Sequence, residues 1–156
     1  MKKLIEYIQN GEIESFQQEW RKKKVRNHQP LLLLAIQQKQ LAIVQFLLKE
    51  SKSLRNSLKF KHKLLHEACR TKNVDIVKTL MEYGCPVYFE DEYYDTPLFT
   101  AIRCKNEEIA YLLLQHDKQI RFHINQGNVF GQTALHLACE HGMKELVSVL
   151  LQYGAN

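Results

Sequence analysis

Two histidine–cysteine pairs are the residues of this sequence best suited to metal chemistry. His66 and Cys69, and likewise His136 and Cys139, stand three positions apart, which would place both side chains of a pair on one face of a helix. A structural zinc ion takes four ligands, and neither pair has a second cysteine or histidine at the usual ligand spacing beside it. We therefore expect no metal site and no cofactor.

Motifs for covalent or phosphate chemistry are missing from the sequence. There are only five serines, none of them in a GxSxG motif, and there is no GxxxxGK[ST] or GxGxxG loop. Neighbouring carboxylates occur at residues 90–92 and 107–108, where we expect open surface and not a cleft that could hold a substrate. The sequence predicts a protein that is not an enzyme and has no small-molecule substrate.

Length and composition indicate one ordinary globular domain. The chain has 156 residues, of which 45% are hydrophobic and 25% are charged. Its longest apolar run, Leu31–Ile36, is far too short to span a membrane. The four cysteines form no CxxC pair, which is typical of free thiols in a reducing compartment. We expect a cytoplasmic protein with its cysteines reduced.

Charge is distributed unevenly along the chain. Residues 1–63 hold 14 Lys/Arg and 5 Asp/Glu, a net +9, whereas residues 64–156 hold 8 Lys/Arg and 12 Asp/Glu, a net −4. The densest basic run is Arg21 to Lys24, with Arg26 nearby. This run is compatible with docking on nucleic acid or an anionic membrane. We favour a solvated helix end, because no nucleic-acid motif accompanies the run.

An internal repeat organises the sequence. A pair of apolar residues recurs 33, 33 and 37 residues apart, a small residue precedes each pair by eight positions, and a second apolar pair follows it by four. The alanine column is Ala35, Ala68, Ala101 and Ala138, and the first apolar column is Ile43, Ile76, Ile109 and Leu146. Each unit therefore reads as a turn, a short helix, a tight break and a longer helix with one apolar stripe.

Residues typical of helix ends occur at the expected places. Thr133 and the pair Thr96-Pro97 are suited to begin short helices. Gly142 fits a left-handed break between helices, and lysines occupy that break in the three preceding units: Lys39, Lys72 and Lys105. Asn73 and Asn106 each follow one of these lysines and are suited to cap the second helices.

These residues resemble the ankyrin repeat. The segment 131–139 (GQTALHLAC), with Gly142, Glu145-Leu146-Val147, Leu150-Leu151 and Gly154-Ala155-Asn156, is similar to it almost throughout. Residues 95–98, and 65–69 with 75–77, are similar to two further copies; residues 30–48 match more loosely, and residues 1–25 resemble a degenerate capping unit.

The resemblance implies an all-α solenoid of stacked helix-turn-helix units with β-hairpin-like tips. Within one domain, 1–156, the units fall at approximately 1–25, 26–58, 59–91, 92–128 and 129–156, and the chain could be the N-terminal part of a longer protein. The resemblance also implies that the two histidines bond to neighbouring backbone and that Cys69 and Cys139 replace a small buried residue. The four extra residues before the last unit fall within 117–125, where alternating Ile120, Phe122 and Ile124 predict an extended excursion.

Members of this family usually bind other proteins through a concave face formed by the tips and the short helices. The tip aromatics carried over from the repeat are Phe60, Tyr93 and Phe130. The remaining candidates for partner binding are Lys59, Arg70, Phe89, Glu90, Glu92, Tyr94, Asp95, Arg103, Gln132, Glu140 and His141. We therefore predict a protein–protein interaction module, or scaffold, without catalysis.

Two further expectations concern the chain as a whole. The last unit keeps its apolar stripe where a terminal repeat normally turns polar, which predicts self-association through the C-terminal repeat. The chain could also be the substrate-recruiting part of a larger enzyme, as in the effectors that intracellular bacteria secrete into the host cytosol.

Overall fold

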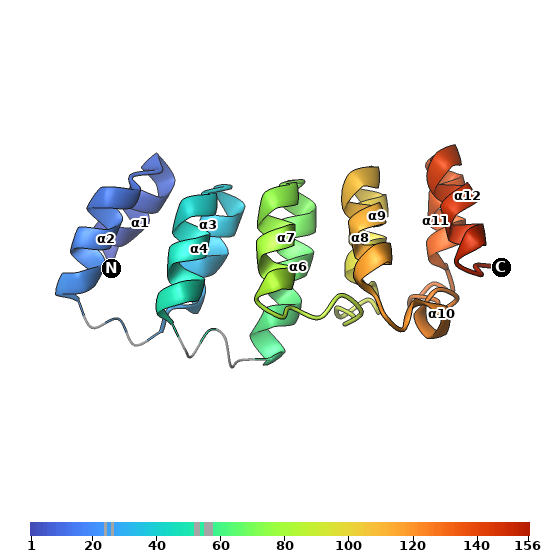
Figure 1. The fold of residues 1–156 in the computed structure, drawn as a ribbon, viewed down its shortest axis with the longest axis horizontal. Helices are drawn as coiled ribbons and strands as arrows, with labels where there is room; N and C mark the ends of the chain where they lie inside the picture. The colour runs from blue at the N-terminus through green and yellow to red at the C-terminus, as the bar shows by residue number, and fades with distance from the viewer. Residues whose placement is uncertain (24, 26, 52–53, 55–57) are drawn as a thin grey trace. The chain divides into compact units, whose positions relative to one another are not determined.

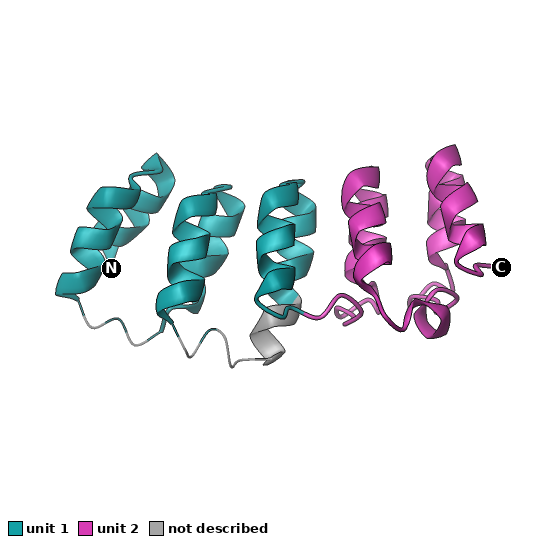
Figure 2. Cartoon of the chain, viewed as in Figure 1, with its two compact units in different colours: residues 1–85 teal, residues 86–156 magenta. Residues whose placement is uncertain are grey.

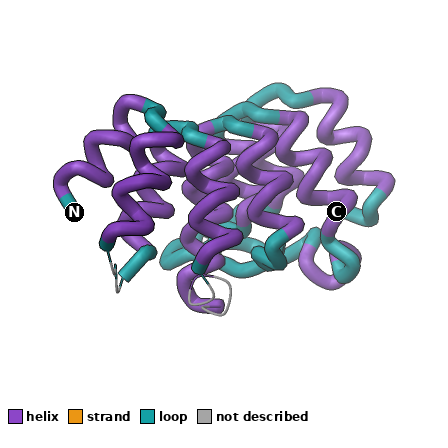
Figure 3. The backbone as a smooth tube through the Cα atoms, turned by 60° about the vertical axis from the view of Figure 1, so that its left-hand side comes forward, coloured by secondary structure: helices purple, strands orange, loops and turns teal. Residues whose placement is uncertain are grey.

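The chain folds into successive pairs of antiparallel helices (Figure 1). The computed structural model describes the backbone of residues 1–23, 25, 27–51, 54 and 58–156, and the side chains of these residues except 58–62. No strand occurs among the described residues (Figure 3). The all-α class and the helix-pair repeat are thus as predicted. None of the described helices is both long and apolar enough to cross a membrane.

The pairs group into two compact units, residues 1–85 and residues 86–156 (Figure 2). In unit 1 the first helices of the pairs pack on one another, and so do the second helices. Its helices are α1 (Lys2–Asn10), α2 (Ile13–Lys22), α3 (Gln29–Gln37), α4 (Leu41–Glu50), α6 (Leu58–Thr71) and α7 (Val74–Glu82).

Unit 2 repeats this arrangement with two pairs and one short helix between them. Helix α11 packs on α8, and α12 packs on α9. The helices are α8 (Pro97–Arg103), α9 (Glu107–His116), α10 (Ile120–His123), α11 (Ala134–Glu140) and α12 (Lys144–Gln152).

The repeated columns form the core. All four residues of the alanine column are fully buried, as are all four of the first apolar column. Within each unit, alanine lets the short helices approach closely, and the apolar stripes of successive second helices pack on one another. The core of each unit is therefore the sum of contacts between its successive repeats, as in other repeat proteins.

The breaks between helices have the predicted left-handed backbone. Lys39, Lys72 and Lys105 have φ of 57°, 59° and 53°, a conformation that costs an L-residue about 1 kcal/mol relative to glycine. Gly142 has the same conformation at φ 69° without that cost. The side chains of the asparagines that follow Lys72 and Lys105 accept backbone N–H bonds at the starts of α7 and α9, as predicted.

Glycine at one of these breaks is expected to stabilise the protein. Lys72→Gly removes the left-handed penalty and should raise the free energy of unfolding by about 1 kcal/mol in urea denaturation. The same substitution at Lys78, exposed inside α7, should lower it by about 1 kcal/mol. If both variants are destabilised, the break lysine is not strained.

The two threonines at the starts of short helices behave differently. The Thr133 hydroxyl accepts from the His136 N–H at 3.4 Å, and His136 Nδ1 accepts from the Thr133 N–H at 3.2 Å, which completes a capping box. The backbone bond implied for His136 is thus present. Thr96 occupies the N-cap of α8 and is followed by Pro97, but its side chain makes no cap bond. Phe99 occupies the position at which a polar residue would complete a capping box. Thr96 and Pro97 therefore begin α8 as predicted, and only the side-chain bond is missing.

The predicted extended excursion at 117–125 was also wrong, because the segment forms the short helix α10. Ile120 and Ile124 lie four positions apart, so one helix face carries both, and Ile124 is buried. Phe122 falls on the other side and is 82% exposed. His123 is partly buried and pairs with Asp117.

Cys139 is exposed, contrary to the prediction that it is buried like Cys69. Cys69, Ile102 and Cys139 occupy one column of the repeat, and the first two are fully buried. Ile102 belongs to α8, on which α11 packs. Among the described residues no helix pair follows α11 and α12, so the same position of the last pair stays open to solvent.

An aromatic cluster joins the helices of unit 1. Trp20 stacks on Phe16 with ring centroids 5.8 Å apart and meets the edge of Phe46 at 6.0 Å. The His28 ring lies 4.6 Å from Trp20, and its nitrogens contact Ser51 Oγ and the Val25 carbonyl oxygen, both at 2.6 Å. These contacts hold His28, the residue before α3, against Trp20 of α2.

Candidate protein-binding surface

The two tips of unit 2 have the same turn. Asp91 Oδ1 accepts from the backbone N–H groups of Tyr93 and Asp95 at 2.9 and 3.1 Å. Asn128 Oδ1 accepts from those of Phe130 and Gln132 at 3.0 and 3.1 Å. A side chain that holds its own turn in this way fixes the backbone of the tip.

A left-handed residue completes each turn. Gly131 has φ 70° at this position, whereas Tyr94 adopts φ 58° with a full side chain. For tyrosine this conformation carries a strain of about 1 kcal/mol. The strain places a second aromatic ring beside Tyr93 on the first tip, and strained backbone of this kind is often found at functional sites.

The two tips are bonded to each other. The Val129 N–H donates to the Tyr93 carbonyl oxygen at 3.0 Å. Below this bond, the Asp95 carboxylate accepts from Asn128 Nδ2 at 2.9 Å and from Arg103 Nε at 2.8 Å. Asp95 and Asn128 are both 6% exposed, so the bond between them is buried, whereas Arg103 is exposed. The tips therefore form one ordered surface.

Four large apolar side chains are exposed on these tips. They are Tyr93 (53% exposed), Tyr94 (58%), Val129 (47%) and Phe130 (71%), and we call them the tip surface. Single exposed apolar residues are ordinary, but four on two bonded tips form a patch of the composition found at the centres of protein interfaces.

Acidic side chains flank the tip surface. Glu90 and Glu92 are exposed on the first tip, and neither makes an ion pair within the described part of the chain. On the second tip Gln132 Nε2 donates to Glu140 Oε2 at 3.4 Å. Arg103 is a nearby cation, and its guanidinium is already paired with Asp95.

The structure brings most of the predicted site residues together in unit 2. Phe89 is half-buried and stacks on Tyr88, and His141 is half-buried as the C-cap residue of α11. Asp95, predicted to contact a partner directly, is buried and instead holds the tips together. Arg70 belongs to unit 1, where it is exposed and paired with Glu67 at 3.4 Å.

Two predicted residues are not at a turn tip. Helix α6 begins at Leu58, so residues 59 and 60 are helical. Unlike the tips of unit 2, this segment has no Asp, Asn or Gly to form a turn. The side chains of Lys59 and Phe60 lie outside the described residues, as do Lys24 and Arg26 of the basic run. Lys23, from the same run, pairs with Glu19 at 2.6 Å.

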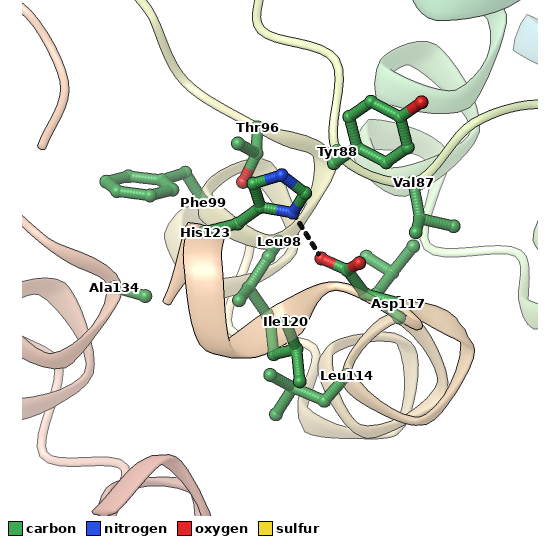
Figure 4. Close-up of a pocket in the computed structure, with 11 residues that line it drawn as sticks. Val87, Tyr88, Thr96, Leu98, Phe99, Leu114, Asp117, Ile120, His123 and Ala134 are labelled. Atoms are coloured by element: carbon green, nitrogen blue, oxygen red, sulfur yellow. Dashed lines mark hydrogen bonds and ion pairs between the residues drawn. The ribbon is translucent and has the colours of Figure 1, made fainter. Parts of the chain in front are cut away.

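Sequence reasoning missed a small pocket beneath the first tip. The rings of Tyr88 and His123 stack 5.0 Å apart, and His123 Nδ1 lies 3.0 Å from Asp117 Oδ2 (Figure 4). Leu98, Phe99, Leu114 and Ile120 are among the other lining residues. The pocket has room for about one water molecule. The sequence feature that could have indicated this pocket is the extra length before the last unit, because that extra segment forms α10.

No metal centre emerges from the described residues, which contain no group of three or more His, Cys, Asp and Glu side chains placed to hold an ion. His136 is occupied by its capping box, and His66 is 2% exposed.

Stacked helix pairs with bonded tips define a helical repeat protein with a surface suited to protein recognition. Comparison with known families gives the specific repeat. The model described as ankyrin repeats (3 copies) matches residues 2–91, 32–124 and 65–156. The chain belongs to the ankyrin repeat family, whose members are generally protein-interaction modules.

Individual relatives match over part of their length. The chain is 33% identical over 99 residues to ankyrin repeat protein FPV031 of fowlpox virus, covering 62% of this chain and 28% of that protein. It is 28% identical over 93 residues to E3 ubiquitin-protein ligase KEG of Arabidopsis thaliana, covering 59% and 6%. It is 31% identical over 91 residues to human transient receptor potential cation channel subfamily A member 1, covering 58% and 8%. The match thus spans 28% or less of each of these relatives.

Proposed function

We propose that this protein is a non-catalytic interaction module that binds a partner protein through the tip surface of unit 2. The tip surface is part of the concave face predicted from the sequence. One observation carries the proposal: Tyr93 and Phe130 occupy the same position of two turns that are bonded through the Tyr93 carbonyl and the Val129 N–H. Both rings are exposed on backbone that is already fixed, so binding costs little ordering entropy.

Proximity cross-linking tests this proposal. A photo-crosslinker is placed at Val129 in the wild-type chain and in the Tyr93→Ala/Phe130→Ala variant. The proteins that each captures are identified by mass spectrometry and compared. A partner that is lost with the double variant supports the tip surface. The matched control is Phe122→Ala, which removes an even more exposed ring from α10. Capture that survives the double variant and fails with Phe122→Ala would move the site to α10.

A second candidate function is self-association through the last helix pair. Leu114 and Ala110 of α9 are almost fully buried. Their equivalents in α12 are not: Leu151 corresponds to Leu114 and is 53% exposed, and Val147 corresponds to Ala110 and is half-exposed. Together with Cys139 these side chains leave an apolar face without a neighbour among the described residues.

Association through this face is expected to depend on protein concentration. Sedimentation velocity should show wild-type protein forming larger species as concentration rises, and Leu151→Lys should remain a monomer because it places a charge on the apolar face. Gln152→Lys adds the same charge at an exposed neighbour and should associate like the wild type. A wild-type protein that stays monomeric at every concentration contradicts this candidate.

A third candidate is the substrate-recruiting part of a larger enzyme. It is favoured by the name of one relative, an E3 ubiquitin-protein ligase of which the matched part covers 6%. Sequencing of the full transcript tests it: an adjoining catalytic domain supports the recruiting role, and its absence refutes it.

We also place the protein in the cytoplasm, or in the host cytosol if it is a secreted effector. None of the four cysteines forms a disulfide in the structure, and Cys69 and Cys85 are buried. Titration of natively purified protein with a thiol reagent under denaturing, non-reducing conditions should find all four thiols. Before denaturation Cys139 should react first, because it is the exposed one. Two or fewer thiols would overturn the assignment to a reducing compartment.

A further inference from the structure

Unit 2 carries an excess of negative charge. Residues 86–156 contain nine Asp/Glu and five Lys/Arg, a net −4. Three of the nine carboxylates have structural roles: Asp91 holds the first tip, Asp95 joins the two tips, and Asp117 pairs with His123. The carboxylates available to a partner must come from the remaining glutamates.

Two of these glutamates lie on the first tip, one residue apart. Glu90 and Glu92 are exposed, and Glu92 immediately precedes Tyr93 and Tyr94. Within the described part of the chain, Arg103 is the cation bonded into the tip network, and Asp95 offsets its charge at 2.8 Å. The tip surface is thus bordered by two carboxylates with no ion-pair partner among the described residues.

Aromatic rings and carboxylates favour the same class of ligand. The face of a tyrosine or phenylalanine ring attracts an ammonium or guanidinium group, and so does an adjacent carboxylate. The same rings provide apolar contact area for an aliphatic or aromatic side chain. An acidic or uncharged partner would leave the two glutamates desolvated without compensation.

We propose that the tip surface binds a cationic segment of its partner, in which Lys or Arg flanks an apolar anchor residue. The apolar anchor contacts the rings of Tyr93 and Phe130, and the cations face Glu90 and Glu92. This inference rests on the proposed function and adds the chemistry of the partner to it.

Selection from a random peptide library tests the chemistry without a known partner. Peptides displayed on phage are selected on the immobilised full chain, and clones that also bind Tyr93→Ala/Phe130→Ala are removed. We expect the remaining clones to be enriched in peptides that combine Lys or Arg with an aromatic or aliphatic residue. Enrichment of neutral or acidic peptides that still need Tyr93 and Phe130 would overturn the cationic partner and leave the proposed function standing. If every basic clone is lost at the removal step because it also binds the double variant, or if no peptide is enriched at all, both would be overturned.

Charge reversal on the tip gives a quantitative test with a selected basic peptide as probe. Glu90→Lys/Glu92→Lys should weaken binding about tenfold at low salt, and the difference should shrink as salt is added. Glu108→Lys/Glu145→Lys is the matched control. This control changes the net charge by the same amount as the double substitution on the tip. Glu108 and Glu145 are exposed in the first turns of α9 and α12, at the end of the helix pairs away from the tips. Equal weakening by both double variants would reduce the effect to net charge and overturn the inference; circular dichroism confirms that each variant is folded.

Discussion

Replacing Asp95 with alanine is expected to lower the free energy of unfolding by about 2 kcal/mol. The Asp95 carboxylate accepts from Asn128 Nδ2 at 2.9 Å and from Arg103 Nε at 2.8 Å, and both Asp95 and Asn128 are buried. Without it the Asn128 amide loses a partner in a site that water does not reach, which costs the desolvation of that group. Urea denaturation followed by far-ultraviolet circular dichroism measures the loss.

Two substitutions separate this network from a general effect of removing charge. Asp95→Asn keeps an oxygen that can accept from Asn128, so it should cost less than alanine. Glu92→Ala removes an exposed carboxylate three residues away and should change stability by less than about 0.5 kcal/mol. An Asp95→Ala variant as stable as Glu92→Ala would show that the tips do not depend on this carboxylate.

Tyr93→Ala is expected to weaken partner binding about thirtyfold, or about 2 kcal/mol, while leaving the fold intact. The ring is 53% exposed, so its removal leaves no cavity, whereas the backbone groups of Tyr93 still bond to Asp91 and Val129. Isothermal titration calorimetry with the cross-linked partner, once identified, measures the affinity.

The control for this prediction is Lys72→Ala, at the helix break of unit 1 and not at a tip. It should bind like the wild type. A Tyr93→Ala variant that is folded and binds with unchanged affinity would assign the exposed rings to bracing of adjacent tips. The double variant with Phe130→Ala adds a second test, because rings that share one partner residue should show non-additive losses.

The repeated elements could be predicted because each is set by a local signal or by the repeat itself. The alanine column, the left-handed lysines and the caps at Asn73 and Asn106 all follow from residue type and period, and the structure confirms them. The paired tips also had a signal. Asp91 and Asn128 are 37 residues apart, the same step that separates the core columns of these two units.

What could not be predicted depends on contacts between elements. Three alternating apolar residues at 120–124 fit a strand, but the outer two also fit one face of a helix, and packing decides between them. The burial of Cys139 depends on whether a helix pair covers it, which the residue itself does not reveal. The role of Asp95 depends on Asn128, 33 residues later in the sequence.

The cluster around Trp20 gives the protein a built-in spectroscopic reporter. It is the only tryptophan in the sequence, it lies in unit 1, and it contacts Phe16, Phe46 and His28. Its fluorescence emission therefore senses melting of the first helix pairs and is blind to the tips of unit 2, while circular dichroism sums over all helices. Noncoincident fluorescence and dichroism curves would mean that the two units melt separately, and a partner bound at the tips would then shift the dichroism transition alone.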